Sequence, residues 1–235
     1  MDKGIIYYTD NRIQEPIRSV VRSYILASGL PIVSSSLEPI DFGTNLVLRG
    51  KERGYTTQVE QIITALENSM AEAVFFCEHD VLYHLSHFEF TPERDDVYYY
   101  NFNNCRWDYP RDRIITYDEL TSLSMLCAKR NLVLRHYKMR LSKIREMGWD
   151  DKSPEPQWAR TMGYEPGTKK RKRGGLTDED YEKWNSTYPC VDIRHKGTFS
   201  RPKVKLEEFK HLPTNWRETT LDKVPGWNLK ELFEL

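Results

Sequence analysis

The sequence AVFFCEHDVLY, residues 73–83, combines an unbroken apolar run with two carboxylates at its end. A continuous run that includes Val and two Phe is typical of a strand buried on both faces of a parallel sheet. Glu78 and Asp80, separated by one residue, then fall at the carboxyl end of that strand. Ligands bind at this edge in open α/β sheets, and hard carboxylate oxygens suit Mg²⁺ or Mn²⁺ held together with a diphosphate. The stretch therefore predicts a nucleotide-handling enzyme.

The segments before this run alternate between strand and helix patterns. Residues 4–8 form a short apolar run followed by Thr9-Asp10-Asn11, and residues 31–35 form a second candidate strand. Residues 15–27 and 57–69 carry apolar side chains at helical spacing. Because the order is strand, helix, strand, helix, strand, the chain is expected to build a parallel sheet.

The pattern changes after residue 93. Residues 97–102 form an aromatic-rich strand pattern, which often joins a mixed sheet. A long helix is predicted from the capping box at residues 116–119 to about residue 144, and short helices at 177–184 and 228–233. We therefore predict an α/β fold of Rossmann-like type, with a mixed, mainly parallel central sheet flanked by helices.

Composition limits the classes of protein that this chain can be. Its 235 residues suit one larger α/β domain, taken here as residues 1–235. Lys plus Arg and Asp plus Glu both total 35, so no overall charge draws the protein to nucleic acid or membrane. The four Cys have no CxxC spacing, which argues against a zinc site or a disulfide framework. The sequence opens on a strand pattern without an apolar leader, and we expect a cytoplasmic protein of a bacterial cell or phage-infected host that does not bind membrane.

The triplet Glu78-His79-Asp80, placed after the predicted strand and helix repeats, resembles the acid-x-acid metal motif of the glycosyltransferase-A superfamily, which uses nucleotide-sugar donors. The resemblance implies that Asp80 coordinates Mn²⁺ or Mg²⁺ on the donor diphosphate, and that Glu78, a departure from the usual Asp, contacts the ribose or shapes the turn. A UDP-sugar is the expected donor. The alternative interpretation is a polar loop after a buried strand.

A second segment, Asp192-Ile193-Arg194-His195-Lys196-Gly197, resembles the late Asp-x-Arg-His-Gly segment of many small members of this superfamily. The resemblance implies that His195 completes the metal shell. Arg194 and Lys196 could then neutralise diphosphate charge as the bond to the sugar breaks. Lys196, inserted before Gly197, departs from the commonest form. Without the first motif, a His between two basic residues would be taken as solvated.

The end of the first strand is where the superfamily usually receives the nucleotide base and ribose. Tyr8 could stack on uracil, while Thr9 or Asp10 accepts its polar edge. Asp10 could equally cap the following helix. Arg49 opens a segment, residues 49–55, that resembles the loop facing the donor phosphates in relatives. For any one of its residues, a solvated loop is the simpler interpretation.

An inverting enzyme of this type needs a carboxylate that deprotonates the acceptor hydroxyl. Asp108, after the aromatic strand, is one candidate. The acids of residues 178–180 are others, and Asp180 is preferred among them. Helix N-termini also attract acids for electrostatic reasons, and a retaining enzyme would not need the base.

A basic run, Lys169–Arg173, lies within a Pro- and Gly-containing loop at residues 166–175. It could hold a polyanionic acceptor such as DNA, and small enzymes of this superfamily include phage-type enzymes that glycosylate hydroxymethylated bases. A solubilising loop would look the same. We assign residues 1–110 to the nucleotide-sugar half and 111–235 to the acceptor half.

Other functions stay open at this point. The acceptor could instead be a glycan or a protein. A nucleotidyltransferase would share the sheet and the metal, but normally carries a Gly-rich phosphate loop that Thr9-Asp10-Asn11-Arg12 lacks. A non-catalytic nucleic-acid-binding protein would depend on Lys169–Arg173 instead of Asp80.

Overall fold

Strand β1 (Lys3–Thr9) lies at the centre of the parallel part of the first sheet, with β2 (Ile32–Ser36) on one side and β4 (Ala73–Glu78) on the other. This arrangement is seen in a computed structural model that describes residues 1–118, 120, 122–149, 165–168, 181–198, 203–209 and 212–235. The apolar runs of β1 and β4 are buried, as a strand covered on both faces requires.

The first sheet has seven strands in the order β10-β6-β9-β4-β1-β2-β3. Its further strands are β3 (Thr44–Val47), β6 (Tyr98–Asn101), β9 (Leu126–Lys129) and β10 (Tyr181–Trp184). Among the described strands of this sheet, β9 alone runs antiparallel to its neighbours, β4 and β6. The predicted mixed, mainly parallel α/β sheet is therefore confirmed.

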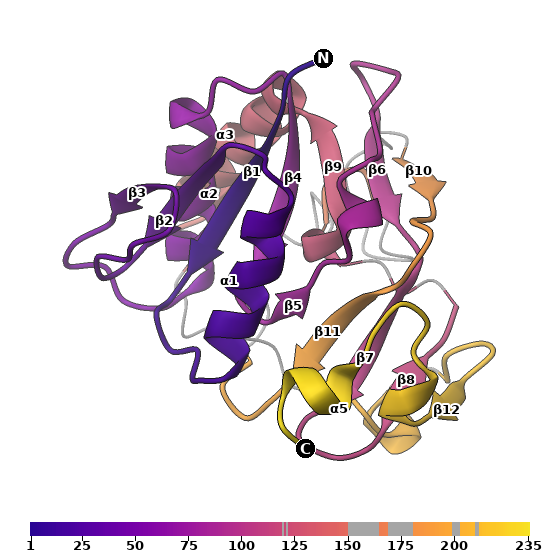
Figure 1. Ribbon diagram of the computed structural model, residues 1–235. Helices are drawn as coiled ribbons and strands as arrows, with labels where there is room; N and C mark the ends of the chain where they lie inside the picture. Colours follow the sequence, from indigo (N-terminus) through magenta and orange to yellow (C-terminus); the bar gives the residue numbers. More distant parts are fainter. Residues whose placement is uncertain (119, 121, 150–164, 169–180, 199–202, 210–211) are drawn as a thin grey trace.

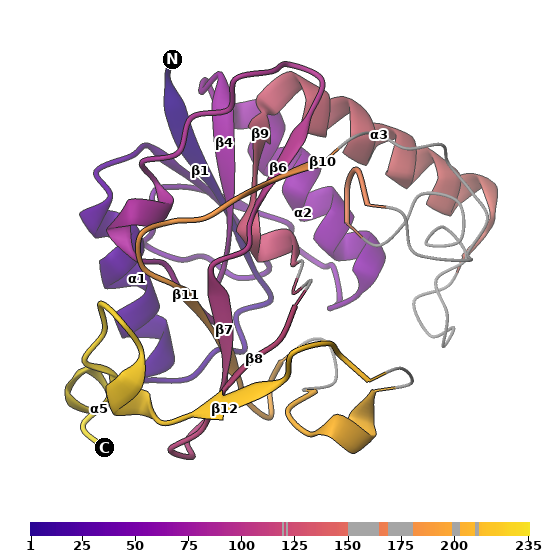
Figure 2. The same ribbon diagram turned by 90° about the vertical axis from the view of Figure 1, so that its right-hand side faces the viewer.

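Helices cover both faces of this sheet (Figure 2). On one face lies α1 (Ile17–Ala27), which buries Ile17, Val21 and Ile25 at helical spacing. On the other lie α2 (Tyr55–Asn68) and α3 (Arg130–Glu146), which contact each other.

A second, smaller sheet lies beyond the carboxyl ends of β1 and β4 (Figure 1). Its strand order is β12-β8-β7-β11-β5. The strands are β5 (Val81–Leu82), β7 (Asn104–Asp108), β8 (Ile114–Thr116), β11 (Cys190–Arg194) and β12 (Arg217–Thr219). Because β5 begins three residues after β4 ends, the chain passes from one sheet to the other at His79 and Asp80.

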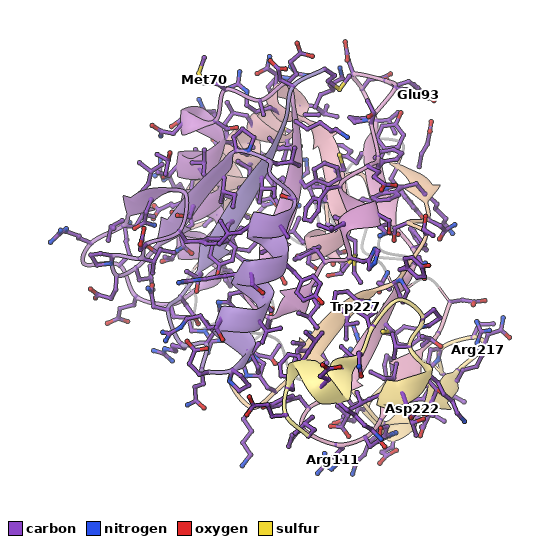
Figure 3. The ribbon with its side chains drawn as sticks, in the orientation of Figure 1. Met70, Glu93, Arg111, Arg217, Asp222 and Trp227 are labelled. Carbon is purple, nitrogen blue, oxygen red and sulfur yellow. The ribbon has the colours of Figure 1, made fainter. Side chains whose placement is uncertain are left out.

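Short helices complete the described chain. They are η1 (Leu85–His87), η2 (Leu123–Met125), η3 (Leu206–Glu208), η4 (Leu221–Lys223) and α5 (Leu229–Leu232). Figure 3 shows Met70 at the end of the molecule opposite Arg111 and Asp222.

The predicted helix at residues 228–233 corresponds to α5.

Two expectations about secondary structure were wrong. The helix predicted from residue 116 begins only at Arg130, because Leu126, Cys127 and Ala128 are buried in β9, which pairs with β4 and β6. In the helix predicted over 177–184, residues 181–184 form β10 paired with β6, and residues 177–180 lie outside the described residues. In both places backbone pairing with a neighbouring strand outweighs local helix propensity.

Candidate active site

A cavity of about 280 Å³ is lined by the carboxyl ends of β1 and β4. Tyr8 and Glu78 are paired neighbours in these two strands. From β1 the chain continues to β2 on one side and returns to β4 on the other, so this is the position where the winding of the sheet reverses. Open α/β sheets bind ligands at such a position, and the two predicted acids are located there.

Asp80 lies where the chain leaves the first sheet for the second. Its backbone C=O accepts a hydrogen bond of 2.8 Å from the N–H of Ile193 in β11. Its side chain is buried, and Oδ2 lies 3.6 Å from Nε2 of His195. Burial opposes ionisation, but His195, His79 and Arg194 together outweigh it, and the pKa of Asp80 lies below its ordinary value. Asp80 is thus a charged carboxylate at neutral pH.

The pKa of Glu78 is shifted in the opposite direction from that of Asp80. Its Oε1 accepts a 2.7 Å hydrogen bond from the hydroxyl of Tyr8. Burial, followed by the charge of Asp80, raises the pKa of Glu78 to about 8. Glu78 keeps its proton because no positive charge among the described residues is close enough to offset a second carboxylate beside Asp80. A divalent cation beside them would allow both to ionise, so the carboxylate pair fits a hard metal ion.

His195 fits the predicted metal shell less directly. The N–H of Gly197 donates to its Nδ1 at 3.1 Å, so the ring hydrogen of the neutral imidazole lies on Nε2, which faces Asp80 as a donor. That Nε2 is buried, and the Asp80 oxygen 3.6 Å away lies just beyond ordinary hydrogen-bonding distance. Ligation would need a bare Nε2, and so requires the contact with Gly197 to open.

The described residues contain no group of three or more His, Cys, Asp or Glu side chains that could hold a metal ion by themselves. Mg²⁺ is commonly bound in this open way, by one or two carboxylates together with substrate phosphates and water. Asp80 and Glu78 therefore suit a cation that arrives with its ligand.

The residues predicted to receive the base are held by neighbours at the end of β1. The Oγ1 of Thr9 lies 2.7 Å from Nδ1 of His79. A carboxylate oxygen of Asp10 lies 2.6 Å from Nε of Arg53, whose Nη2 donates to the carbonyl of Gly197 at 3.0 Å. Arg53 therefore connects the segment before α2 to the end of β1 and to the segment after β11.

The second sheet contributes a charged cluster to the same cavity. Asp192 and Arg194 are two residues apart on β11 and both line the cavity. Nη1 of Arg194 lies 3.3 Å from Asp192, and Nε of Arg106, on the neighbouring strand β7, lies 3.6 Å from it. The predicted role of Arg194 near a diphosphate is compatible with this position.

Another part of the wall carries a buried cation. Arg140, on α3, is 1% exposed, and its Nη2 lies 2.9 Å from Nε2 of His136 one turn earlier. Tyr137 and Glu165 line the cavity beside it. Burying a charge is costly, and such groups are concentrated at functional sites.

Four predicted residues are not among those that line this cavity, although one of them, His195, lies 3.6 Å from Asp80. Arg49 and Lys196 are exposed and do not line it. Asp108 is buried at the end of β7, where Arg111 at 2.9 Å and Arg113 at 3.5 Å pair with its carboxylate. Its side chain is therefore committed to a local ion-pair cluster.

The remaining sequence predictions lie outside the described residues. These are Asp180 with its neighbours at 178–179, and the basic run Lys169–Arg173.

Many residues of the cavity wall were not among the predicted site residues, and they include Arg53, Gln61, Arg106, Arg140 and Glu165. Arg53 is the one that the sequence could have revealed, because it belongs to the same basic segment as Arg49. The others have no motif, and only the packing of distant elements brings them together.

Within the described part of the chain, no helix is both long and apolar enough to cross a bilayer. No family model matches the sequence, and no curated protein matches it.

Solved structures share part of the chain path. A glycosyltransferase involved in glycosylation of the major capsid of PBCV-1 aligns over 79% of this chain and 82% of its own, with 14% identity and a TM-score of 0.45. S. aureus TarS 1–349 aligns over 82% and 60%, with 11% identity and a TM-score of 0.45. The bifunctional IspDF from Campylobacter jejuni aligns over 63% and 48%, with 11% identity and a TM-score of 0.36. Similarity at this level does not assign an activity.

Proposed function

We propose that this chain is a metal-dependent glycosyltransferase that moves a sugar from a nucleotide-sugar, with a UDP-sugar as the expected donor, to an acceptor hydroxyl. The observation that carries the proposal is the position of Asp80. It is a charged, buried carboxylate next to Glu78 at the carboxyl edge of a parallel sheet, in a cavity that Arg194 also lines. Acids that hold a hard cation and guanidinium groups that bind phosphate are the requirements for a donor diphosphate.

The charges in the cavity suit the departure of a nucleoside diphosphate. A divalent ion bound with the donor would supply Lewis-acid stabilisation of the leaving diphosphate. Asp80 and Glu78 would hold that ion. Arg194 and Arg53 lie at two different parts of the wall, each within 3.5 Å of an acid that fixes its orientation. Preoriented cations of this kind stabilise developing phosphate charge without reorganising.

Sugar transfer by direct displacement also needs an acceptor for a proton. The bond between the anomeric carbon and the diphosphate oxygen breaks, and its electron pair stays on the diphosphate. The acceptor oxygen forms the new bond to carbon and releases its proton to a carboxylate. We assign this role to Glu165. Its carboxylate lines the cavity but does not belong to the group formed by Glu78, Asp80 and Asp192. Its segment is tied to β6 by a 2.6 Å hydrogen bond from the hydroxyl of Tyr100 to the carbonyl of Pro166.

The proposal is tested by the release of nucleoside diphosphate from a panel of nucleotide-sugars, with Mn²⁺ present, in the absence and presence of candidate DNA, glycan and protein acceptors. We expect one donor to be turned over, and Asp80→Asn to lower that rate by about 100-fold or more. Asp96→Asn is the matched control, because Asp96 is exposed and pairs with Arg94 away from the cavity. Turnover of no donor, or equal rates in the two variants, would contradict the proposal.

A further inference from the structure

Gln61, on α2, is buried beneath the ends of two parallel strands. It is 4% exposed and lines the cavity. Its Nε2 donates to the carbonyl of Thr9 at 2.8 Å and to the carbonyl of Ser35 at 3.2 Å. Both hydrogens of the amide nitrogen are therefore used to join the end of β1 to β2.

These two bonds fix which way the amide points. A carbonyl oxygen can only accept, so the amide group facing Thr9 and Ser35 must be the NH₂. The other atom, Oε1, is therefore an oxygen, and no group in the described residues donates a hydrogen bond to it. Gln61 thus presents to the cavity a hydrogen-bond acceptor with no donor of its own left to offer.

The distance between the Gln61 acceptor and Asp80 limits which molecule can contact both. Gln61 bonds to the ends of β1 and β2, whereas Asp80 follows β4 on the other side of β1. With neighbouring strands roughly 5 Å apart, the two residues are separated by about two strand spacings. A molecule with its phosphates at Asp80 can therefore place a second polar group near Gln61.

The surroundings of Gln61 favour a flat, partly apolar group. Leu37, Val59 and Ile62 line the same cavity and come from the end of β2 and from α2. Apolar walls with one oriented polar atom are typical of sites that hold a heterocycle and select its hydrogen-bonding edge.

We propose that Gln61 recognises the base of the nucleoside diphosphate by accepting a hydrogen bond from a ring N–H. This inference rests on the proposed function and specifies its donor. It selects bases with an imide or lactam N–H, namely uracil and guanine, against cytosine and adenine, whose corresponding ring nitrogen is itself an acceptor. Thr9 and Asp10, the residues first expected to contact the base, already have His79 and Arg53 as partners.

The test is calorimetric binding of UDP, GDP, CDP, ADP and inorganic diphosphate in the presence of Mn²⁺. In the wild-type chain UDP or GDP should bind at least roughly tenfold more tightly than CDP and ADP. Methylation of the preferred base at its ring nitrogen, in 3-methyluridine or 1-methylguanosine diphosphate, should weaken binding by the same factor. This arm uses the unaltered protein, so it does not depend on how a variant folds.

Two variants assign the effect to one side chain. Gln61→Met should abolish the preference among bases and leave the affinity for inorganic diphosphate within about twofold. Gln58→Met is the matched control, one turn earlier on α2 and also on the cavity wall, and it should retain the preference.

The possible results distinguish a failure of the role of Gln61 from a failure of the proposed function. If neither inorganic diphosphate nor any nucleoside diphosphate binds with Mn²⁺, the proposed function fails and the inference with it. If all four nucleotides bind equally, if the methylated base binds as well as its parent, or if Gln58→Met and Gln61→Met behave alike, the role of Gln61 is overturned while the donor site stands.

Discussion

Glu78 and Asp80 are only two residues apart, yet their surroundings shift their pKa values in opposite directions. Burial and the charge of Asp80 raise the pKa of Glu78 to about 8, whereas His195, His79 and Arg194 overcome burial and lower the pKa of Asp80. Carboxyl groups whose pKa values are pushed apart are characteristic of functional sites. The sequence could predict that two acids follow a buried strand, but not which of them is charged. The neighbours that decide it are the last residue of β11, the residue after it, and His79 in the turn between the two acids.

Replacement of Glu165 by Gln tests the proposed acceptor of the proton. Glu165→Gln keeps the size of the side chain and removes its basicity, so kcat should fall by about 10²- to 10⁴-fold, with little change in the KM for the donor. Steady-state kinetics with saturating acceptor would measure this. The control is Glu182→Gln, because Glu182 is an exposed residue of β10 that forms an ion pair with Arg94. If the two variants had the same kcat, Glu165 would not be the base.

His87 should make the stability of the fold depend on pH. It is fully buried among the rings of Phe75, Tyr83 and Trp184, and burial lowers its pKa to about 3. Because an unfolded His titrates near 6.5, the unfolded chain binds the extra proton between about pH 6.5 and pH 3. The contribution of His87 to the unfolding free energy is therefore complete above pH 6.5 and is lost as the pH falls.

The expected size of this effect is about 2 kcal/mol between pH 7.5 and pH 5. Urea unfolding of the wild type and of His87→Phe at both pH values would isolate it, since the ring volume is retained and the titrating group is removed. The variant should lose about 2 kcal/mol less than the wild type on acidification. Equal losses in the two proteins would show that His87 does not titrate in this way.

At the scale of elements, the sequence predicted well where apolar periodicity is clean. Strands β1, β2 and β4 and helices α1 and α2 lie close to the predicted residues, since each combines a long apolar pattern with a clear turn. The part of the predicted helix from residue 116 to residue 129 was wrong, because Leu126-Cys127-Ala128 suits a buried helix or a buried strand equally well by pattern. Its pairing with β4 and β6, distant in sequence, decides for the strand.

Trp227 packs the segment that leads into α5 against α1. Trp227 is 8% exposed, its ring centroid lies 4.9 Å from that of Tyr24 on α1, and its Nε1 donates to the carbonyl of Pro189 at 2.7 Å. Figure 3 shows it where the C-terminal segment meets the body of the molecule. It therefore connects α1 to the start of β11.

Truncation of this side chain should destabilise the fold more than loss of its hydrogen bond. We expect Trp227→Ala to lower the unfolding free energy by about 3–5 kcal/mol. Trp227→Phe, which keeps a ring but not the N–H, should cost about 1 kcal/mol. Denaturant unfolding of both variants would measure the difference. A loss for Trp227→Ala no larger than that for Trp227→Phe would refute this account of the segment.

At the scale of the whole molecule, two sheets meet at the candidate site. The first supplies Tyr8 and Glu78, the second supplies Asp192 and Arg194, and Asp80 lies in the connection between them. The second sheet could not be predicted, because its described strands are two to five residues long and carry little periodic signal. Arg106 reaches the cavity only through the pairing of β7 with β11, and so had no sequence signature.

The central claim is that Asp80 holds a divalent ion together with a nucleoside diphosphate. The most direct measurement is the unfolding free energy of the wild type, Asp80→Asn and the control Asp96→Asn with UDP or GDP, each with and without Mn²⁺. At 100 times its dissociation constant the nucleotide should stabilise the wild type and the control by about 2.7 kcal/mol, only when Mn²⁺ is present, and should not stabilise Asp80→Asn. Stabilisation that persists without Mn²⁺ or in Asp80→Asn, or that is absent in all three proteins, would contradict the claim.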